Sequence, residues 1–145
     1  MIGSRLRSFA VLAATGLLLA SCAEPPTVAA NELESVPIVR GLSPVESTVG
    51  QSKEHPRWPV PDPTEKVDRF EVQTDYDTLR EQMRHDPDNH WRESNTVSSS
   101  TFKLDPPPKG FKYFWVILVN GKRKVDGRDT PAPGWCEISV FRLPD

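Results

Sequence analysis

The chain has 145 residues, of which 37% are hydrophobic and 26% are charged, and its formal net charge is −2. This mild acidity argues against general nucleic-acid binding, which normally shows a strongly basic surface. No nucleic-acid partner is therefore expected. Net charge by itself gives no information about the fold, which has to come from the elements of the chain.

The amino terminus has the three parts of a secretory signal peptide. A basic start with Arg5 and Arg7 leads into an apolar run over residues 9–20, and the small residues Ala20 and Ser21 then precede Cys22. This order predicts that residues 1–21 are a signal peptide and are removed. The apolar run is shorter than the roughly 20 residues that a membrane-spanning helix needs, so spanning is the weaker interpretation.

The residues at the predicted cut site resemble a lipobox. Leu19-Ala20-Ser21-Cys22 follows the pattern of Leu, two small residues and Cys that bacterial lipoproteins share. The resemblance covers only the signal segment and the first mature residue. It implies that the thiol of Cys22 carries a diacylglyceryl group and that its new amino group is acylated. Two or three acyl chains would hold the protein on a membrane, since each buried methylene contributes about 0.8 kcal/mol. The alternative is an ordinary signal peptide with an incidental cysteine.

The residue after the cysteine bears on the location. Asp at this place retains lipoproteins of enterobacteria-like cells in the inner membrane, and this chain has Ala23 there instead. The resemblance therefore implies a lipid-anchored protein of the bacterial cell membrane. If the cell has two membranes, it implies the outer membrane, facing the periplasm.

Residues 22–64 are expected to be the lipidated amino terminus and a flexible, proline-rich tether. Eight of the 15 prolines fall between positions 25 and 63, and no apolar periodicity is sustained there. Such a composition buries too little apolar surface to offset the entropy of ordering the chain. Near its end Trp58 stands among prolines. This side chain is expected either to dock on the domain or to offer a polyproline-type ligand to an aromatic groove.

From residue 66 onward the pattern becomes that of a folded domain. Alternating apolar residues predict a strand over about 66–73, and Thr74 or Asp75 offers a helix cap. Three apolar residues then follow at helical spacing: Tyr76, Leu79 and Met83. Pro87 predicts the end of this helix, because the residue before a proline is pushed out of the helical region.

The remaining elements are predicted to be strands. A polar strand is expected at about 96–104, and the strongest strand at 111–119. The pair Asn120-Gly121 predicts a tight hairpin turn into a return strand at 122–126. The last strand is expected at about 135–143. The 111–119 strand is apolar on both faces, which predicts a central position with cover above and below.

These elements together predict an α+β domain over residues 65–145. Its sheet is expected to be small and mostly antiparallel, with four to five strands and one helix packed on a face. A domain of this size is close to the limit at which a single hydrophobic core suffices.

Two charged clusters are candidate sites. The histidines and aspartates of residues 85–90 are metal-type ligands, but the Asn and Pro among them equally suit a helix-ending loop. No metal or other cofactor is therefore expected. The basic side chains of Lys122, Arg123 and Lys124 could meet an anionic sugar, a lipid phosphate or an acidic protein partner. The alternative is that they protect an edge strand from pairing with other chains.

The second cysteine, Cys136, alternates with Ile138 and Val140 in a strand-like run. Free cysteine is among the most buried residue types, so a buried thiol is expected. The alternative is a bridge to another chain. If Cys22 carries lipid, no disulfide can form within the mature chain.

The chain contains none of the common catalytic patterns, such as Gly-x-Ser-x-Gly, a phosphate loop or His-Glu-x-x-His. The expected function is therefore a membrane-anchored lipoprotein whose non-catalytic domain binds a protein or another envelope component, with Trp58 and the basic residues 122–124 as candidate contacts. One alternative is a small envelope hydrolase or sugar-binding enzyme, which requires a pocket with converging polar groups. Another is a structural lipoprotein without a discrete ligand.

Overall fold

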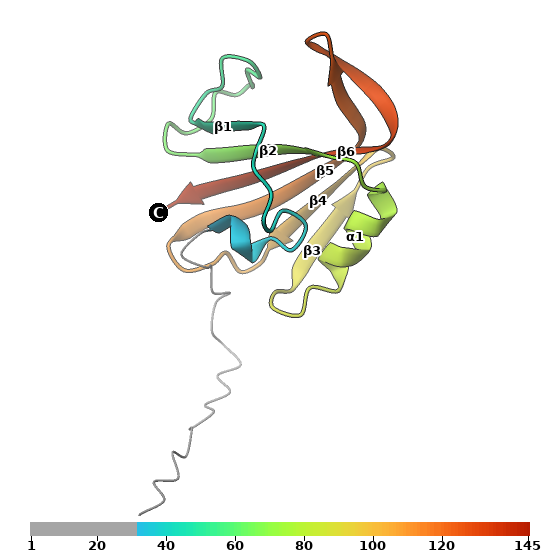
Figure 1. Cartoon of the computed structure of the whole chain (residues 1–145). Coiled ribbons are helices and arrows are strands. Elements are labelled where there is room, and N and C mark those ends of the chain that lie inside the picture. The colour runs from blue at the N-terminus through green and yellow to red at the C-terminus, as the bar shows by residue number, and fades with distance from the viewer. Residues whose placement is uncertain (1–31) are drawn as a thin grey trace, which may run out of the picture.

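The computed structural model describes residues 32–145, and of residues 123–125 and 129–132 the backbone only. The predicted signal peptide, Cys22 and Ala23 lie outside these residues. The elements in chain order are η1 (Glu32–Ser35), β1 (Glu46–Val49), β2 (Lys66–Val72), α1 (Tyr76–Arg84), β3 (Trp91–Asn95), β4 (Ser99–Leu104), β5 (Phe111–Val125) and β6 (Arg128–Pro144) (Figure 1). None of the helices in this part of the chain is long and apolar enough to cross a membrane.

The strands form one six-stranded sheet in the order β1-β2-β6-β5-β4-β3. Every neighbouring pair is antiparallel, and only β2 and β6 are neighbours that do not follow one another in sequence. The prediction of an α+β domain with a mostly antiparallel sheet and one α-helix is confirmed. The expected four to five strands are too few, because β1 and β3 come from segments that the sequence did not mark as strands.

The segment from residue 32 to residue 64 is part of the fold, so the prediction of a flexible tether is wrong for these residues. Val36, Ile38 and Val39 are at most 6% exposed and belong to the hydrophobic core. β1 pairs with β2 from Glu46 to Val49. The apolar run at 36–39 is too short to show a period, yet it covers part of one sheet face that would otherwise meet water.

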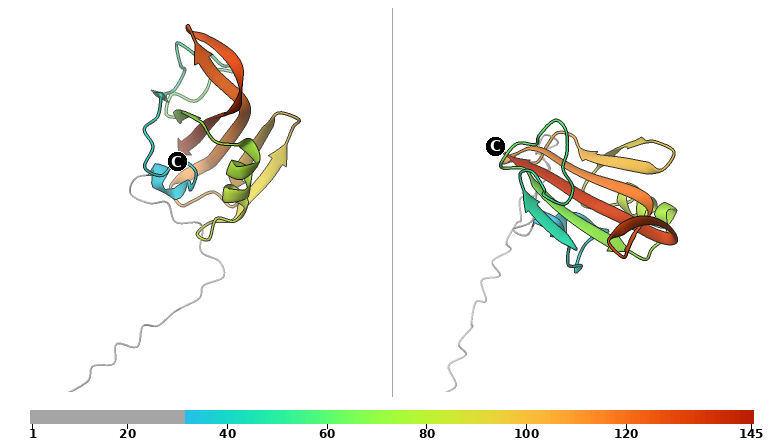
Figure 2. Two further views of the ribbon diagram at one scale, coloured as in Figure 1. Left: turned by 45° about the vertical axis from the view of Figure 1, so that its right-hand side comes forward. Right: turned by 90° about the horizontal axis from the view of Figure 1, so that it is seen from above.

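This covered face, the inner face, carries the core. Phe114, Val116 and Leu118 of β5 are completely buried there. Helix α1 lies over the same face as the 36–39 segment (Figures 1 and 2) and contributes Leu79 and Met83. Asp75 caps α1 by accepting a hydrogen bond from the backbone of Thr78, so the predicted helix, its cap and its buried positions are confirmed.

The hairpin between β5 and β6 turns later than expected. Asn120-Gly121 does not form the turn; it lies at an irregularity within β5, where the register shifts and Gly121 has a φ of 77°. The chain reverses instead at Asp126-Gly127, where both φ angles are positive as a type I′ turn requires. Pairing of β4 with β5 stops at Val119, so the residues beyond it form a two-stranded arm that projects from the sheet (Figure 1).

Strand β3 lies between the predicted helix and the strand expected at about 96–104, where no strand was predicted. It pairs with β4 from Trp91 to Asn95. Its one large apolar side chain, Trp91, is 6% exposed, and the indole N–H donates to Asp86 at 2.9 Å. A single apolar residue shows no alternation, which is why the strand was missed.

Candidate functional site

The opposite face of the sheet, the outer face, carries no helix in the part of the chain that the structure describes, and it is only partly covered: Val67, Phe141 and Leu143 are buried there. Tyr113, Trp115 and Ile117 of β5 are only partly buried on this face. Tyr113 and Trp115 stack with ring centroids 4.4 Å apart, and the ammonium group of Lys103 lies 4.4 Å from the Trp115 ring centroid. The prediction that β5 is covered on both sides is therefore wrong, and the outer face remains available for other roles.

One loop reaches this face. The Trp58 loop, defined as residues 50–65, connects β1 to β2 and is closed at its base by a hydrogen bond from the Gly50 N–H to the Glu65 carbonyl. Gly50 has a φ of 77°, and a Cβ there would lie 3.1 Å from the Pro63 carbonyl oxygen. A side chain at this position would therefore be strained and crowded.

Further contacts hold the Trp58 loop against the domain. The guanidinium of Arg57 lies over the Phe141 ring, 5.0 Å from its centroid, and donates to the Glu65 carboxylate. Tyr113 donates its hydroxyl proton to the same carboxylate. The Gln51 side chain both donates to the Arg57 carbonyl, at 3.0 Å, and accepts from the Arg57 N–H, at 3.2 Å. Burial raises the pKa of Tyr113, which keeps the hydroxyl protonated as the donor.

Trp58 itself points away from these contacts. Its side chain is 86% exposed, and Val60, two residues later, is 56% exposed. Of the two expectations for Trp58, docking on the domain is therefore wrong. Arg57 makes the docking contact instead, because its charged guanidinium pairs with the buried Glu65 carboxylate.

A small polar pocket lies on the outer face between β1 and the start of the Trp58 loop. Its volume is about 140 Å³, and charged side chains make up most of its lining: Glu46, Glu54, His55, Arg69, Glu71 and Glu137, with Val45. Antiparallel pairing brings these residues together, since Glu46 is opposite Arg69 and Glu71 is opposite Glu137. The Arg69 guanidinium lies 3.5 Å from Glu137 and donates to Ser139.

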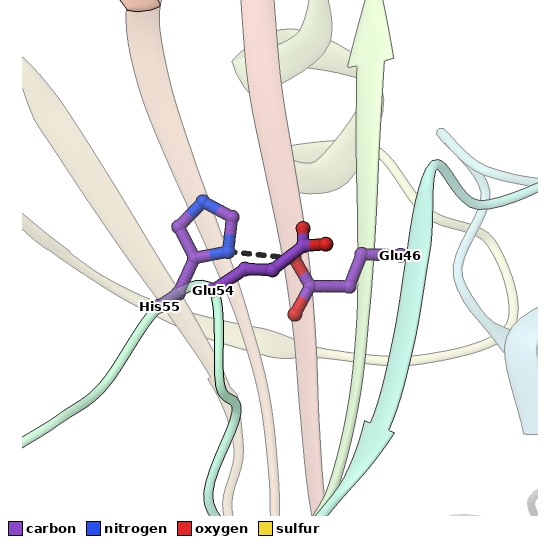
Figure 3. Close-up of side chains that lie close together, drawn as sticks. All are labelled: Glu46, Glu54 and His55. Atoms are coloured by element: carbon purple, nitrogen blue, oxygen red, sulfur yellow. Dashed lines mark ion pairs between the residues drawn. The ribbon is translucent and has the colours of Figure 1, made fainter. Parts of the chain in front are cut away.

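The densest part of the pocket is the trio Glu46, Glu54 and His55 (Figure 3). Their ligand-type atoms all lie within 4.8 Å of one another. The His55 Nδ1 and Glu46 Oε2 atoms are 2.6 Å apart, and both are shielded from water. Burial works against ionisation of Glu46, but hydrogen bonds from Ser52 and His55 and the nearby positive charge lower its pKa overall. Among the described residues, this trio is the group best placed to hold a metal ion.

The sequence did not single out this trio. Glu46, Glu54 and His55 lie in the segment that was assigned to the tether, and nothing in their spacing resembles a metal motif. They converge because β1 pairs with β2 and the chain then turns back at Ser52. The adjacent acid and imidazole of Glu54-His55 were the only local signal.

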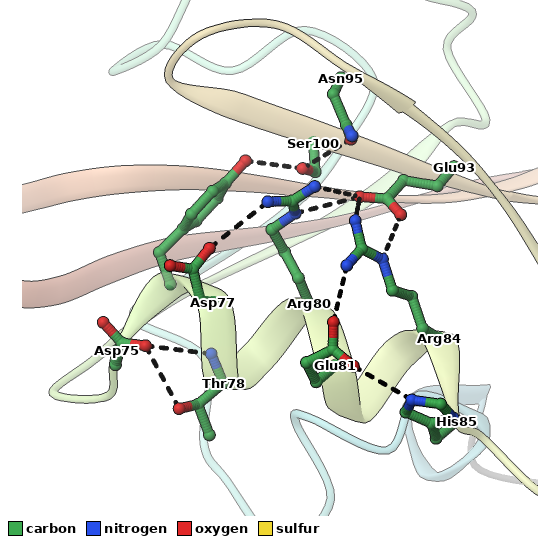
Figure 4. Close-up of polar contacts among 11 residues, drawn as sticks. Asp75, Asp77, Thr78, Arg80, Glu81, Arg84, His85, Glu93, Asn95 and Ser100 are labelled. Atoms are coloured by element: carbon green, nitrogen blue, oxygen red, sulfur yellow. Dashed lines mark hydrogen bonds and ion pairs between the residues drawn. The ribbon is translucent and has the colours of Figure 1, made fainter.

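Three of the candidate metal ligands in residues 85–90 make contacts with other side chains. The His85 ring lies 3.0 Å from Glu81, Asp86 accepts from Trp91, and Asp88 pairs with Arg40 at 3.2 Å. The Glu81 contact is part of a network between α1 and β3 that Figure 4 shows. These side chains therefore serve the helix end and its neighbours, as the alternative interpretation predicted.

In that network, two arginines of α1 hold one carboxylate of β3. The Glu93 carboxylate accepts from Arg84 at 2.6 Å and from Arg80 at 3.0 Å. Burial disfavours the charged form of Glu93, but these hydrogen bonds outweigh it, so the pKa of Glu93 lies below its ordinary value. The network ties the helix to the sheet and offers no open coordination position.

The two groups of predicted contact residues lie apart. Trp58 is in the loop between β1 and β2, while Lys122, Arg123 and Lys124 belong to the arm formed by β5 and β6 (Figure 1). The arm extends beyond β4, so at residues 122–124 strand β5 pairs with β6 alone, and its other edge has no neighbouring strand in the described part of the chain. The structure therefore does not bring the candidate contacts into one site.

Cys136 is completely buried on the inner face, opposite Val72, and it is a free cysteine. Burial raises the pKa of its thiol, which disfavours the thiolate that a nucleophile needs. The prediction of a buried thiol is confirmed.

An open groove lies beside α1. Its volume is about 800 Å³, and its lining includes Asp75, Asp77 and Glu81. Each of these acids already has a role: Asp75 caps the helix, Asp77 pairs with Arg80, and Glu81 pairs with Arg84. The polar pocket, by contrast, contains carboxylates beyond what its basic groups can pair with.

A scan against protein-family models, a search of curated proteins and a search of solved structures each found no match for this chain. The functional argument therefore rests on the residues and geometry described above.

Proposed function

We propose that this protein is a membrane-anchored lipoprotein whose non-catalytic domain binds a protein of the cell envelope through the Trp58 loop. The observation that supports this best is the 86% exposure of the Trp58 side chain. The residue before it, Arg57, is held against the domain by its contacts with Glu65 and Phe141. An exposed indole offers a partner a large apolar area to bury. Tryptophan is also among the residues most enriched at the energetic centres of interfaces.

The loop's own contacts make it suited to binding. Gln51, Arg57 and Glu65 hold the backbone on both sides of Trp58. A segment that is ordered before it binds loses less conformational entropy on binding than a flexible one does. Trp58 and Val60 would then enter an apolar groove of the partner, in the way that proline-flanked aromatic segments are recognised.

The anchor part of the proposal rests on the lipobox resemblance at Cys22. Because the domain begins by residue 32, only residues 23–31 separate it from the anchor, rather than the whole predicted tether up to residue 64. Even a fully extended chain of this length reaches only about 35 Å. The Trp58 loop would therefore meet partners in or close to the membrane, at a raised local concentration.

Photo-crosslinking in cells tests the binding surface. A photo-reactive amino acid at position 58 is expected to give a discrete protein adduct, identifiable by mass spectrometry. The matched control is position 97, since Val97 is also fully exposed but lies in the turn between β3 and β4. Adducts of the same size from both positions, or none from position 58, would contradict the proposal.

Labelling tests the anchor separately. The wild-type chain is expected to incorporate labelled palmitate, and Cys22→Ser is expected to abolish incorporation. Labelling that persists in the variant would show that Cys22 is not the attachment site.

A second candidate, a small envelope hydrolase, is favoured by the polar pocket, whose carboxylates and imidazole converge as an active site requires. Two observations count against it. The lowered pKa of Glu46 does not suit a general acid, and no serine, threonine or cysteine is among the residues that line this pocket. A screen with ester, phosphoester and glycoside substrates would support it only if turnover is lost in His55→Ala.

A further inference from the structure

We propose that Glu46, Glu54 and His55 form a binding site for a zinc-class divalent cation at the base of the Trp58 loop. This inference does not depend on the proposed partner binding. It rests on three observations: the chemistry of the converging ligands, the burial and closeness of two of the ligand atoms, and the surplus of negative charge in the pocket.

The ligand set suits zinc. One imidazole nitrogen and two carboxylate oxygens are ligands that Zn²⁺ accepts, at about 2.0–2.2 Å from the metal, often with an open fourth position. Two ligands of one ion are then at most about 4.4 Å apart. The three ligand atoms already lie within 4.8 Å of one another. A small rotation of the exposed Glu54 side chain would close the remaining gap.

Two of the ligand atoms are already close together and buried. The Glu46 Oε2 and His55 Nδ1 atoms are shielded from water and form an ion pair with 2.6 Å between them. A zinc ion would take the place of this contact, with the two atoms moved slightly apart so that both bind the metal.

The charge balance points the same way. The pocket is lined by the four carboxylates of Glu46, Glu54, Glu71 and Glu137, against the single guanidinium of Arg69. Arg69 lies beside Glu137. In the described part of the chain, no hydrogen bond or ion pair to the side chain of Glu54 or Glu71 is found. A divalent cation would neutralise this surplus, and Glu71 or a water molecule would supply the fourth ligand.

A buried serine sets the orientation of the ligands. Ser52, which is 7% exposed, donates to Glu46 Oε1 at 2.7 Å and leaves Oε2 turned towards His55 (Figure 3). The same hydroxyl accepts from the backbone N–H groups of Glu54 and His55. Groups that hold ligands in this way contribute to metal affinity without touching the metal. Bound zinc would join β1 to the Trp58 loop and stiffen the loop's attachment.

Calorimetric titration with ZnCl₂ tests the site. The protein is the full chain carrying Cys22→Ser, because a free thiol at position 22 would itself bind zinc, and it is first stripped with a chelator. We expect one zinc ion per chain and a rise in melting temperature. Glu54→Gln and His55→Ala are each expected to weaken zinc affinity by about tenfold or more.

The matched control is His85→Ala. His85 is likewise a histidine beside a glutamate, Glu81, but it is exposed and lies outside the pocket. Its variant is expected to bind zinc like the parent chain. Glu54→Gln remains decisive if His55→Ala fails to fold, since Glu54 has no side-chain partner to lose.

Three outcomes would overturn the proposal. One is no zinc binding at millimolar concentration. Another is unchanged affinity in both pocket variants. The third is tighter binding of Ca²⁺ or Mg²⁺ than of Zn²⁺, which would show a site made of oxygen ligands alone. None of them affects the crosslinking test at position 58, so the two proposals fail separately.

Discussion

The two faces of the sheet are formed by the same strands but differ in how deeply their side chains are buried. On the inner face, Phe114, Val116 and Leu118 of β5 are fully buried under α1 and the 36–39 segment. On the outer face, their neighbours Tyr113, Trp115 and Ile117 are only partly buried. The inner face therefore supplies most of the hydrophobic stabilisation, since stabilisation scales with the apolar area removed from water.

The polar groups differ between the faces as well. On the inner face, charged groups lie at the margin of the core and find opposite charges: Arg142 pairs with Asp68 at 2.6 Å and with Glu32 at 2.8 Å. In the outer pocket the acids outnumber the bases. A charge surplus contributes nothing to folding by itself. This contrast is the reason for placing function on the outer face and in the loop that reaches it.

The largest expected effect on stability comes from a substitution in the middle of the inner face. Phe114→Ala should lower the free energy of unfolding by about 3–5 kcal/mol, because it leaves a cavity and removes the ring contacts with Trp91 and Phe111. Trp115→Ala, one residue later on the outer face, should cost at most about 2 kcal/mol. Urea unfolding measures both. Equal losses would contradict the contrast between the faces.

The next effect is at the margin of the inner face. Arg142→Ala should cost about 3 kcal/mol, because it leaves Asp68, 7% exposed, as a buried carboxylate without its guanidinium. Combining it with Asp68→Asn should recover part of the loss, since the uncompensated charge is then gone. Thermal unfolding of the single and double variants tests this; a double variant less stable than Arg142→Ala would argue against a paired role.

A smaller, pH-dependent effect is expected where α1 meets β3. The pKa of Glu93 is lowered in the folded protein, so its stabilisation is present above the carboxyl pKa of the unfolded chain, about 4.3, and is lost as the pH falls through the folded value. Glu93→Gln should cost roughly 1.5 kcal/mol at pH 7 and little at pH 3. Glu34→Gln, at an exposed carboxylate, is the control. If Glu93→Gln lowers the free energy of unfolding by the same amount at pH 7 and at pH 3, Glu93 does not act through its charge.

The smallest effect on stability is expected at the residue proposed to matter most for binding. Trp58→Ala should change the free energy of unfolding by less than about 0.5 kcal/mol, because the side chain is 86% exposed. Arg57→Ala, which removes the contacts with Glu65 and Phe141, should cost more. Differential scanning calorimetry compares the two variants, and a larger loss for Trp58→Ala would mean that the indole packs on the domain.

Some elements could be predicted because their signals are local. Helix α1 has its cap, its apolar spacing and its terminating proline within 13 consecutive residues of the sequence, and the structure confirms each of them. The hairpin turn shows the limit of such signals. Asn120-Gly121 and Asp126-Gly127 both permit positive φ angles, and only the register of β5 against β6 selects the second pair.

The sequence by itself determined the α+β class, the helix, the central strand β5 and the burial of Cys136, because each depends on the period and character of neighbouring residues. Only the tertiary structure decided that residues 32–64 belong to the domain and that Glu46 meets His55. The physical reason is that a short apolar run such as 36–39, or a strand as short as β1, is stabilised by what it packs against or pairs with. Those partners lie far away in the sequence, so no local sequence pattern indicates them.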